Sequence, residues 1–261
     1  MEAAGYNRLL ENAGSIIRNL IPILIFLAFW EIAPRVGIVN PLFIPPLSDV
    51  NRELLSMIAS GEIFTHVGAS LLRAMEGFSL SMAVGLTLGI AIGWNRKVRE
   101  FLSPLLTLFG NVSPIALFPF FIIILGIGEV SKVGIVFWGC LWPILMNTIS
   151  GVSNANKLLI KAARTMGASQ MRVLFRVVIP DALPEIFPGI RLSASNSILM
   201  LCAAEMLGAS AGLGYLISYS QQVFQLTKMY AAIILIALLG LLFTWILERI
   251  EKSLFIWKGE K

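Results

Sequence analysis

Charged residues are scarce in this sequence. Lys, Arg, Asp and Glu make up 13% of its 261 residues, whereas 57% are hydrophobic. A soluble domain carries roughly a quarter charged residues, so the shortage excludes an ordinary soluble domain. With a mean hydropathy of +0.84, the composition predicts an all-α, polytopic membrane protein.

Residue types that carry enzyme chemistry are also few. His66 is the only histidine, and we expect it at the surface, at the outer edge of a membrane span. The two cysteines, Cys140 and Cys202, lie inside apolar segments, where a small core residue is the expected role. The sequence contains no metal-ligand cluster and no phosphate loop of the G-x-x-x-x-G-K-[ST] kind. We therefore expect no catalytic residue, no metal and no cofactor in this chain, which would not be an enzyme.

Long apolar segments recur along the chain. A helix needs about 20 mostly apolar residues to cross a bilayer, and this rule predicts about six transmembrane helices. Prolines interrupt the third span, which is tolerated where protein covers the broken backbone or where it lines a watery cavity. The predicted organisation is an N-terminal segment, 1–19, and a single transmembrane domain, 20–261. The six spans are approximately 20–38, 67–94, 101–127, 133–152, 185–207 and 230–250.

The longest polar segment, 157–184, separates the fourth span from the fifth. Its apolar residues recur at helical spacing, which predicts two short amphipathic helices with a hinge at Gly167 and a stop at Pro180. Such helices suit insertion into a groove of a partner; a connector that lies on the membrane surface is the alternative. The segment has no acidic residue before Asp181, and its five cations are Lys157, Lys161, Arg164, Arg172 and Arg176.

The positions of the cations predict the orientation. Because Lys and Arg are enriched in cytoplasmic loops, we expect both termini and the segment 157–184 in the cytosol. This arrangement places most of the 20 Lys and Arg residues on the cytosolic side. The net charge of +5 is thus a topology signal and indicates no nucleic-acid partner.

Glycines repeat every fourth residue in the second span, at Gly85, Gly89 and Gly93. Such a stripe forms a smooth face on which another helix can approach closely. The partner helix would belong either to the same chain or to a second subunit. At the start of this span, Arg73 and Glu76 are one helical turn apart and are predicted to pair.

The fifth span is the most polar. Its candidate residues for a translocation path are Arg191, Ser195, Asn196 and Glu205. Arg191 and Glu205 are 14 residues apart, which places them on one face of a helix. A carboxylate inside a span usually faces the protein interior or a cavity. Glu205 would therefore act near an outer gate, or it would accept hydrogen bonds from backbone amides of the glycine-rich turn that follows.

The segment 157–184 also carries a family resemblance. Ala162 and Ala163, then Gly167, then the run Val177-Val178-Ile179-Pro180 resemble the EAA loop of the integral-membrane subunits of ABC importers. Lys161 stands where that loop usually has Glu. The resemblance implies a cytoplasmic coupling helix that docks in a groove of an ATPase subunit. The implied coupling positions are Lys161, Ala162, Ala163, Gly167, Ala168 and Pro180.

Further motifs extend the resemblance to nearly the whole chain. ASLLRAMEGF, VIPDALPEIFPGIRL and AAEMLGASAGLGYLI are similar to the nitrate/sulfonate/taurine/bicarbonate branch of ABC importer permeases. This branch implies the type I importer permease fold in the inner or plasma membrane of a prokaryote. It also implies a homodimer or a dimer of two similar subunits, two ATPase subunits that bind ATP and Mg, and an extracytoplasmic substrate-binding protein.

The expected function is a permease subunit that forms the path for a small anion such as a sulfonate, taurine, nitrate or bicarbonate. A permease for a neutral or zwitterionic compound, such as a vitamin precursor, is an alternative. A secondary carrier that works without ATP is another, although no inverted repeat is visible.

Overall fold

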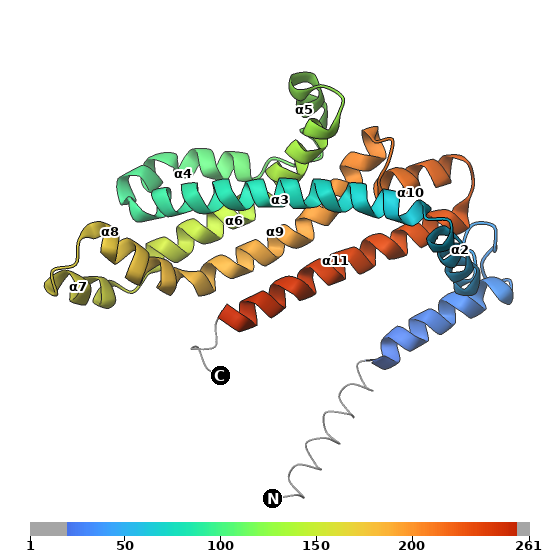
Figure 1. Ribbon diagram of the computed structural model, residues 1–261, viewed down its shortest axis with the longest axis horizontal. Coiled ribbons are helices and arrows are strands. Elements are labelled where there is room, and N and C mark those ends of the chain that lie inside the picture. Colours follow the sequence, from blue (N-terminus) through green and yellow to red (C-terminus); the bar gives the residue numbers. More distant parts are fainter. Residues whose placement is uncertain (1–19, 255–261) are drawn as a thin grey trace, which may run out of the picture. The chain divides into compact units, whose positions relative to one another are not determined.

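A computed structural model describes residues 20–254 of the chain, and these residues are helical with no strand. The predicted N-terminal segment 1–19 and residues 255–261 lie outside them. The all-α prediction is confirmed. Figure 1 shows the helices, which are 20–35, α2 (Leu47–Ala59), α3 (Glu62–Trp94), α4 (Arg96–Gly110), α5 (Phe118–Leu125), α6 (Glu129–Asn154), α7 (Lys157–Thr165), α8 (Gln170–Val173), a π-helical turn (Leu174–Val178), α9 (Ile179–Gly208), α10 (Leu213–Gln222) and α11 (Leu226–Leu254).

The predicted transmembrane domain contains two compact units. The smaller unit comprises 20–63 and Tyr219–Ala231, and the larger comprises Phe64–Ser218 and 232–254. In the smaller unit, the carboxylate of Glu31 caps the start of α2 by accepting from the Ser48 amide at 2.9 Å. Arg35 holds both groups, because it pairs with Glu31 at 2.6 Å and donates to the Ser48 hydroxyl at 2.9 Å.

Three helices in the described residues are long and apolar enough to cross a membrane: α3, α6 and Leu226–Ser253 of α11. A fourth span results if Gln170–Gly208 and α10, which meet at a bend of 46°, count as one. The six predicted spans are therefore not six long continuous helices. The third is divided into α4 and α5, because the proline-containing stretch 111–117 between them is not helical.

The glycine stripe of α3 packs against α6 of the same chain. A Cβ atom at Gly85 would lie 2.9 Å from the Ile144 side chain, and one at Gly89 would lie 2.5 Å from Thr148. At Gly93 the distance to Val152 would also be 2.9 Å. The stripe thus serves helix packing within the chain, one of the two uses that the spacing allowed.

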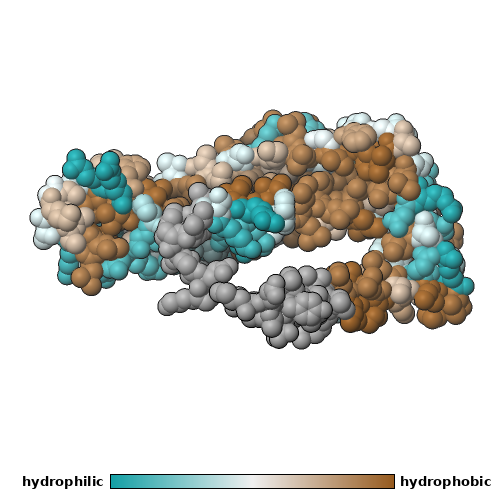
Figure 2. Space-filling model, turned by 60° about the horizontal axis from the view of Figure 1, so that its bottom comes forward, coloured by the Kyte–Doolittle hydropathy of each residue, from teal (hydrophilic) through white to brown (hydrophobic). Residues whose placement is uncertain are grey.

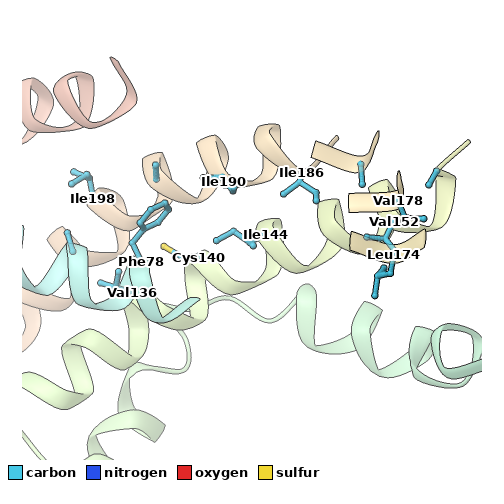
Figure 3. Packing of buried hydrophobic residues seen from close by; sticks show 14 of the residues in the cluster. Phe78, Val136, Cys140, Ile144, Val152, Leu174, Val178, Ile186, Ile190 and Ile198 are labelled. Carbon is cyan, nitrogen blue, oxygen red and sulfur yellow. The ribbon is translucent and has the colours of Figure 1, made fainter. Parts of the chain in front are cut away.

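The core of the larger unit lies between α6 and α9, which run side by side (Figures 1 and 3). Cys140 and Ile144 of α6 lie in the same buried cluster as Ile190 of α9. The two backbones also approach closely, because the Ser193 hydroxyl donates to the Cys140 carbonyl at 2.6 Å. Cys140 is buried with a free thiol, so the predicted core role is correct for this residue.

Hydrophobic side chains cover much of the outside of the larger unit, whereas hydrophilic ones gather at the end that carries α7 and α8 (Figure 2). On α11, Leu238, Leu241 and Trp245 are all more than half exposed. Large apolar side chains facing outward over several helical turns are expected where a helix contacts lipid.

Candidate functional site

The hinge predicted in the segment 157–184 is present. Asn156 caps the start of α7, because its side chain accepts from the Leu158 amide at 2.9 Å. Gly167, two residues after the end of α7, has a φ of +77° and donates its amide to the Arg164 carbonyl at 3.0 Å. Glycine adopts this left-handed conformation without the steric penalty that other residues meet. The short stretch after it leads into α8.

The predicted stop at Pro180 is wrong. Pro180 is the second residue of α9, and helical structure continues from α8 through the π-helical turn into α9. The Ile179 amide donates to the Leu174 carbonyl, five residues earlier, so the hydrogen-bond register changes directly before the proline. A π-helical turn is a local widening of the helix, and this one lies where the proline ring would otherwise clash with the preceding turn, so the segment continues. The polar loop and the membrane span are therefore joined by one helical rod.

The apolar residues of this segment divide into two sets. Val173, Leu174 and Val178 are buried, and Ala163 and Ala168 are half-buried against the same core. The other set is exposed and forms what we call the exposed apolar face. Its members, from 48% to 82% exposed, are Leu158, Leu159, Met166, Met171 and Phe175. Large exposed apolar side chains gathered in a polar segment are typical of a surface that binds another protein.

A charged cluster ties three elements of the larger unit together. Arg73 of α3 is buried and donates to Glu205 of α9 at 2.6 Å. It also pairs with Glu129 at the start of α6 and donates to the Ala211 carbonyl at 2.7 Å. The predicted pair with Glu76 is wrong. Arg73 faces the inside of the helix packing, where two carboxylates meet it, whereas Glu76, one turn further along α3, is exposed.

Glu205 is only 1% exposed. Besides Arg73, it accepts from the Gly214 amide at 2.9 Å and from the Ser70 hydroxyl at 2.9 Å. The Ser70 oxygen in turn accepts from the Leu213 amide at 2.8 Å. Of the two roles open to Glu205, this geometry supports the structural one, in which the carboxylate satisfies amides of the turn after α9.

Arg191 and Glu205 contact different helices, although both lie on α9. Arg191 lies in the half of α9 that adjoins the loop, where it pairs with Glu251 of α11. Fourteen residues correspond to about 21 Å along a helix, so each side chain uses partners at its own level. The shared face that the spacing predicted does not bring the two residues together.

His66 is buried, and the expected surface role is wrong. Its Nδ1 accepts from the Gly212 amide at 3.1 Å, and its ring stacks on Tyr215 with a centroid distance of 6.0 Å. His66 lies one turn before Ser70 on the same face of α3, so both residues hold the turn 209–214. No sequence pattern indicated this contact, because its partner lies 146 residues away.

A cavity of about 470 Å³ lies where the third predicted span is broken. Asn196 lines it, whereas Arg191, Ser195 and Glu205 do not. Leu192 and Met200, one turn before and after Asn196, line the same cavity. Sequence reasoning missed the polar residues that the broken span contributes to this cavity, Thr107 and Asn111. The prolines that interrupt the span were the available signal.

The fold and these sites define a class: a multi-pass helical membrane protein with a cavity at a break in its helices and an exposed apolar face on a polar loop. Residues 83–256 match the family of binding-protein-dependent transport system inner membrane components. The chain belongs to this family, and it is the membrane permease component of a transport system.

Relatives agree over nearly the full length. The chain is 33% identical to a putative aliphatic sulfonates transport permease of Bacillus subtilis (strain 168), over 93% of this chain and 88% of the relative. It is 32% identical to the taurine transport system permease of Escherichia coli (strain K12), over 90% and 88%. A methionine ABC transporter, solved in inward-facing conformations, has a similar fold, with a TM-score of 0.62, 21% identity and coverage of 71% of this chain and 93% of the other.

Proposed function

We propose that this chain forms the translocation path of an ATP-driven importer for a small organic anion of the sulfonate or taurine class. The exposed apolar face is the observation that carries the proposal. A permease without a nucleotide site of its own receives energy only by contact, and this face is the surface suited to receive it. The partner would be an ATPase subunit that binds ATP and Mg.

The helical rod supports a route for that energy. α8, the π-helical turn and α9 are continuous, so a displacement of the loop is transmitted along α9. Asn196, on this helix, lines the cavity of about 470 Å³. At the far end, Glu205 binds the Gly214 amide. Movement of one helix would thus alter the cavity and the turn beyond it together, as alternating access requires.

The cavity supports a small anion as substrate. Its lining includes Thr107, Asn111, Asn196 and Trp142, whose side chains are polar but neutral, and no charged residue lines it. Neutral donors bind an anion weakly enough to release it, which transport requires. The names of the two relatives, which refer to aliphatic sulfonates and taurine, point to the same class. An external binding protein would select the substrate.

The assembly and orientation follow the same proposal. Two permease subunits would pair, as a homodimer or as two similar chains, with lipid around them. The positive-inside pattern would place both termini and α7 in the cytosol, on the side of the ATPase. The turn 209–214 would face outward, toward the binding protein.

Co-purification tests whether the exposed apolar face binds the ATPase subunit. The double variant Leu158→Asp/Met166→Asp places two charges in the exposed apolar face. We expect the amount of ATPase subunit that co-purifies with it to be at least tenfold lower than with the wild-type chain. The matched control is Lys97→Asp, which adds a carboxylate at an exposed position of α4, outside the segment 157–184. Equal recovery of the ATPase by the double variant and the control would reject the proposed surface.

A further inference from the structure

A second cavity, of about 570 Å³, lies at the loop end of the larger unit. The end of α3, the start of α4, the end of α6 and α7 surround it, so it is separate from the cavity that Asn196 lines. Its charged lining is strongly biased toward cations. Four cations face a single carboxylate, and these residues are Arg96, Arg99, Lys157, Arg164 and Glu100.

The four cations differ in what already neutralises them. Arg96 pairs with Glu100 at 2.7 Å, and this contact holds the pKa of the Glu100 carboxyl below its usual range, so the carboxylate stays ionised. Arg99 donates to the Gly93 carbonyl at 3.0 Å and makes no direct ion pair within the described residues. Within residues 20–254, no carboxylate pairs with Lys157 or Arg164. The cavity therefore keeps an excess of positive charge.

The cavity lies at the level where two spans end. α3 ends at Trp94 and α6 ends at Asn154, and both helices are long and apolar enough to cross the membrane. Trp94 lines the cavity beside Arg96. Tryptophan and basic residues gather at the ends of spans, where the headgroups of the bilayer lie. A phosphate at this depth belongs most naturally to a lipid.

We propose that this cavity binds the phosphate group of an anionic phospholipid, with Lys157 and Arg164 as its main contacts. Arginine presents a planar fork of donors that matches phosphate oxygens, and lysine adds a compact charge. The other faces of α7 carry Leu158 and Met166 of the exposed apolar face, so a bound lipid would steady the helix proposed to dock. The inference concerns lipid binding and does not depend on the substrate.

Native mass spectrometry of the full-length chain in detergent tests the proposal. The chain is titrated with phosphatidylglycerol and, separately, with phosphatidylcholine. We expect the wild-type chain to retain one phosphatidylglycerol per chain in preference to phosphatidylcholine. A basic residue near the membrane surface contributes about 1 kcal/mol to the binding of anionic lipid. Lys157→Gln/Arg164→Gln should therefore weaken retention about 30-fold.

The matched control is Lys161→Gln/Arg172→Gln, which removes the same charge from the same segment at positions outside the cavity. Equal melting temperatures in lipid-free detergent would show that both variants fold. A loss restricted to Lys157→Gln/Arg164→Gln supports the proposal, and equal retention by all three proteins overturns it.

A soluble phosphate would use the same donors, so a second titration uses inorganic phosphate. If inorganic phosphate displaces the retained phosphatidylglycerol from the wild-type chain, and does not displace the residual lipid bound to Lys157→Gln/Arg164→Gln, the lipid occupies this cavity. If inorganic phosphate raises the melting temperature of the wild-type chain alone while phosphatidylglycerol has no effect, the lipid source is wrong and the ligand is a free phosphate.

Discussion

The guanidinium of Arg73 on α3 donates to the carboxylate of Glu205 on α9 at 2.6 Å, with both side chains almost fully shielded from solvent. Each residue also holds the turn that follows α9, because Arg73 binds the Ala211 carbonyl and Glu205 binds the Gly214 amide. The pair thus connects two helices of the larger unit to the turn between α9 and α10.

Removal of Arg73 is expected to destabilise the protein strongly. Arg73→Gln leaves the buried Glu205 carboxylate without its cation, and breaking a buried pair in this way costs about 3–5 kcal/mol. The measurement is the thermal unfolding midpoint of the purified chain in detergent. Glu76→Gln is the control, since this exposed carboxylate lies one turn away on α3 and should change stability by less than about 0.5 kcal/mol. Equal effects of the two changes would contradict the buried pair.

Close packing of α3 on α6 predicts opposite effects of two glycine substitutions. Gly89→Ala should destabilise by about 1–3 kcal/mol, because its Cβ would lie 2.5 Å from Thr148. Gly68→Ala, on the same helix, should be neutral or stabilising, because nothing lies within 4 Å of its Cβ position. Unfolding midpoints of both variants provide the comparison. A harmless Gly89→Ala would mean that the helices are farther apart.

The hinge at Gly167 is expected to be necessary for coupling. Gly167→Pro fixes φ near −65°, far from the observed +77°, and removes the amide that caps α7. Coupled transport should be abolished while membrane insertion is retained. Gly61→Pro is the control, because Gly61 has a φ of +79° and a similar amide bond to Ile58, but lies in the smaller unit. Gly61→Pro should leave co-purification of the ATPase intact. Preserved coupled transport in Gly167→Pro would refute the role of the hinge in coupling.

The unusual lysine of the loop should tolerate the acidic residue of the wider family. Lys161 is exposed and lies outside the exposed apolar face, so Lys161→Glu is expected to change substrate-stimulated ATP hydrolysis by less than about twofold, since exposed charges contribute little. A loss of tenfold or more would show that Lys161 makes a specific contact with the ATPase.

Local patterns predicted much of the fold. The positions of α3, α6, α9 and α11 follow from apolar runs, and the hinge at Gly167 follows from the helical spacing on either side of it. These features depend on residues that are close in the sequence, where the period of a helix fixes which side chains share a face.

The contacts inside the membrane domain could not be predicted in the same way. Arg73 meets Glu129 and Glu205, which lie 56 and 132 residues away, so the nearby Glu76 appeared to be the natural partner. The continuation past Pro180 was missed because the π-helical turn is a change of register without a sequence signal. α10 was not predicted at all, because its short, mixed sequence lacks the length of a span.

Substrate-stimulated ATP hydrolysis tests the central claim most directly. The chain is reconstituted in proteoliposomes with its ATPase and binding protein, and hydrolysis is measured with taurine, an alkanesulfonate, nitrate, bicarbonate and a neutral pyrimidine. The account predicts stimulation by a sulfonate that disappears in Leu158→Asp/Met166→Asp and persists in Lys97→Asp. Transport of the substrate by this chain with the ATPase absent would contradict it.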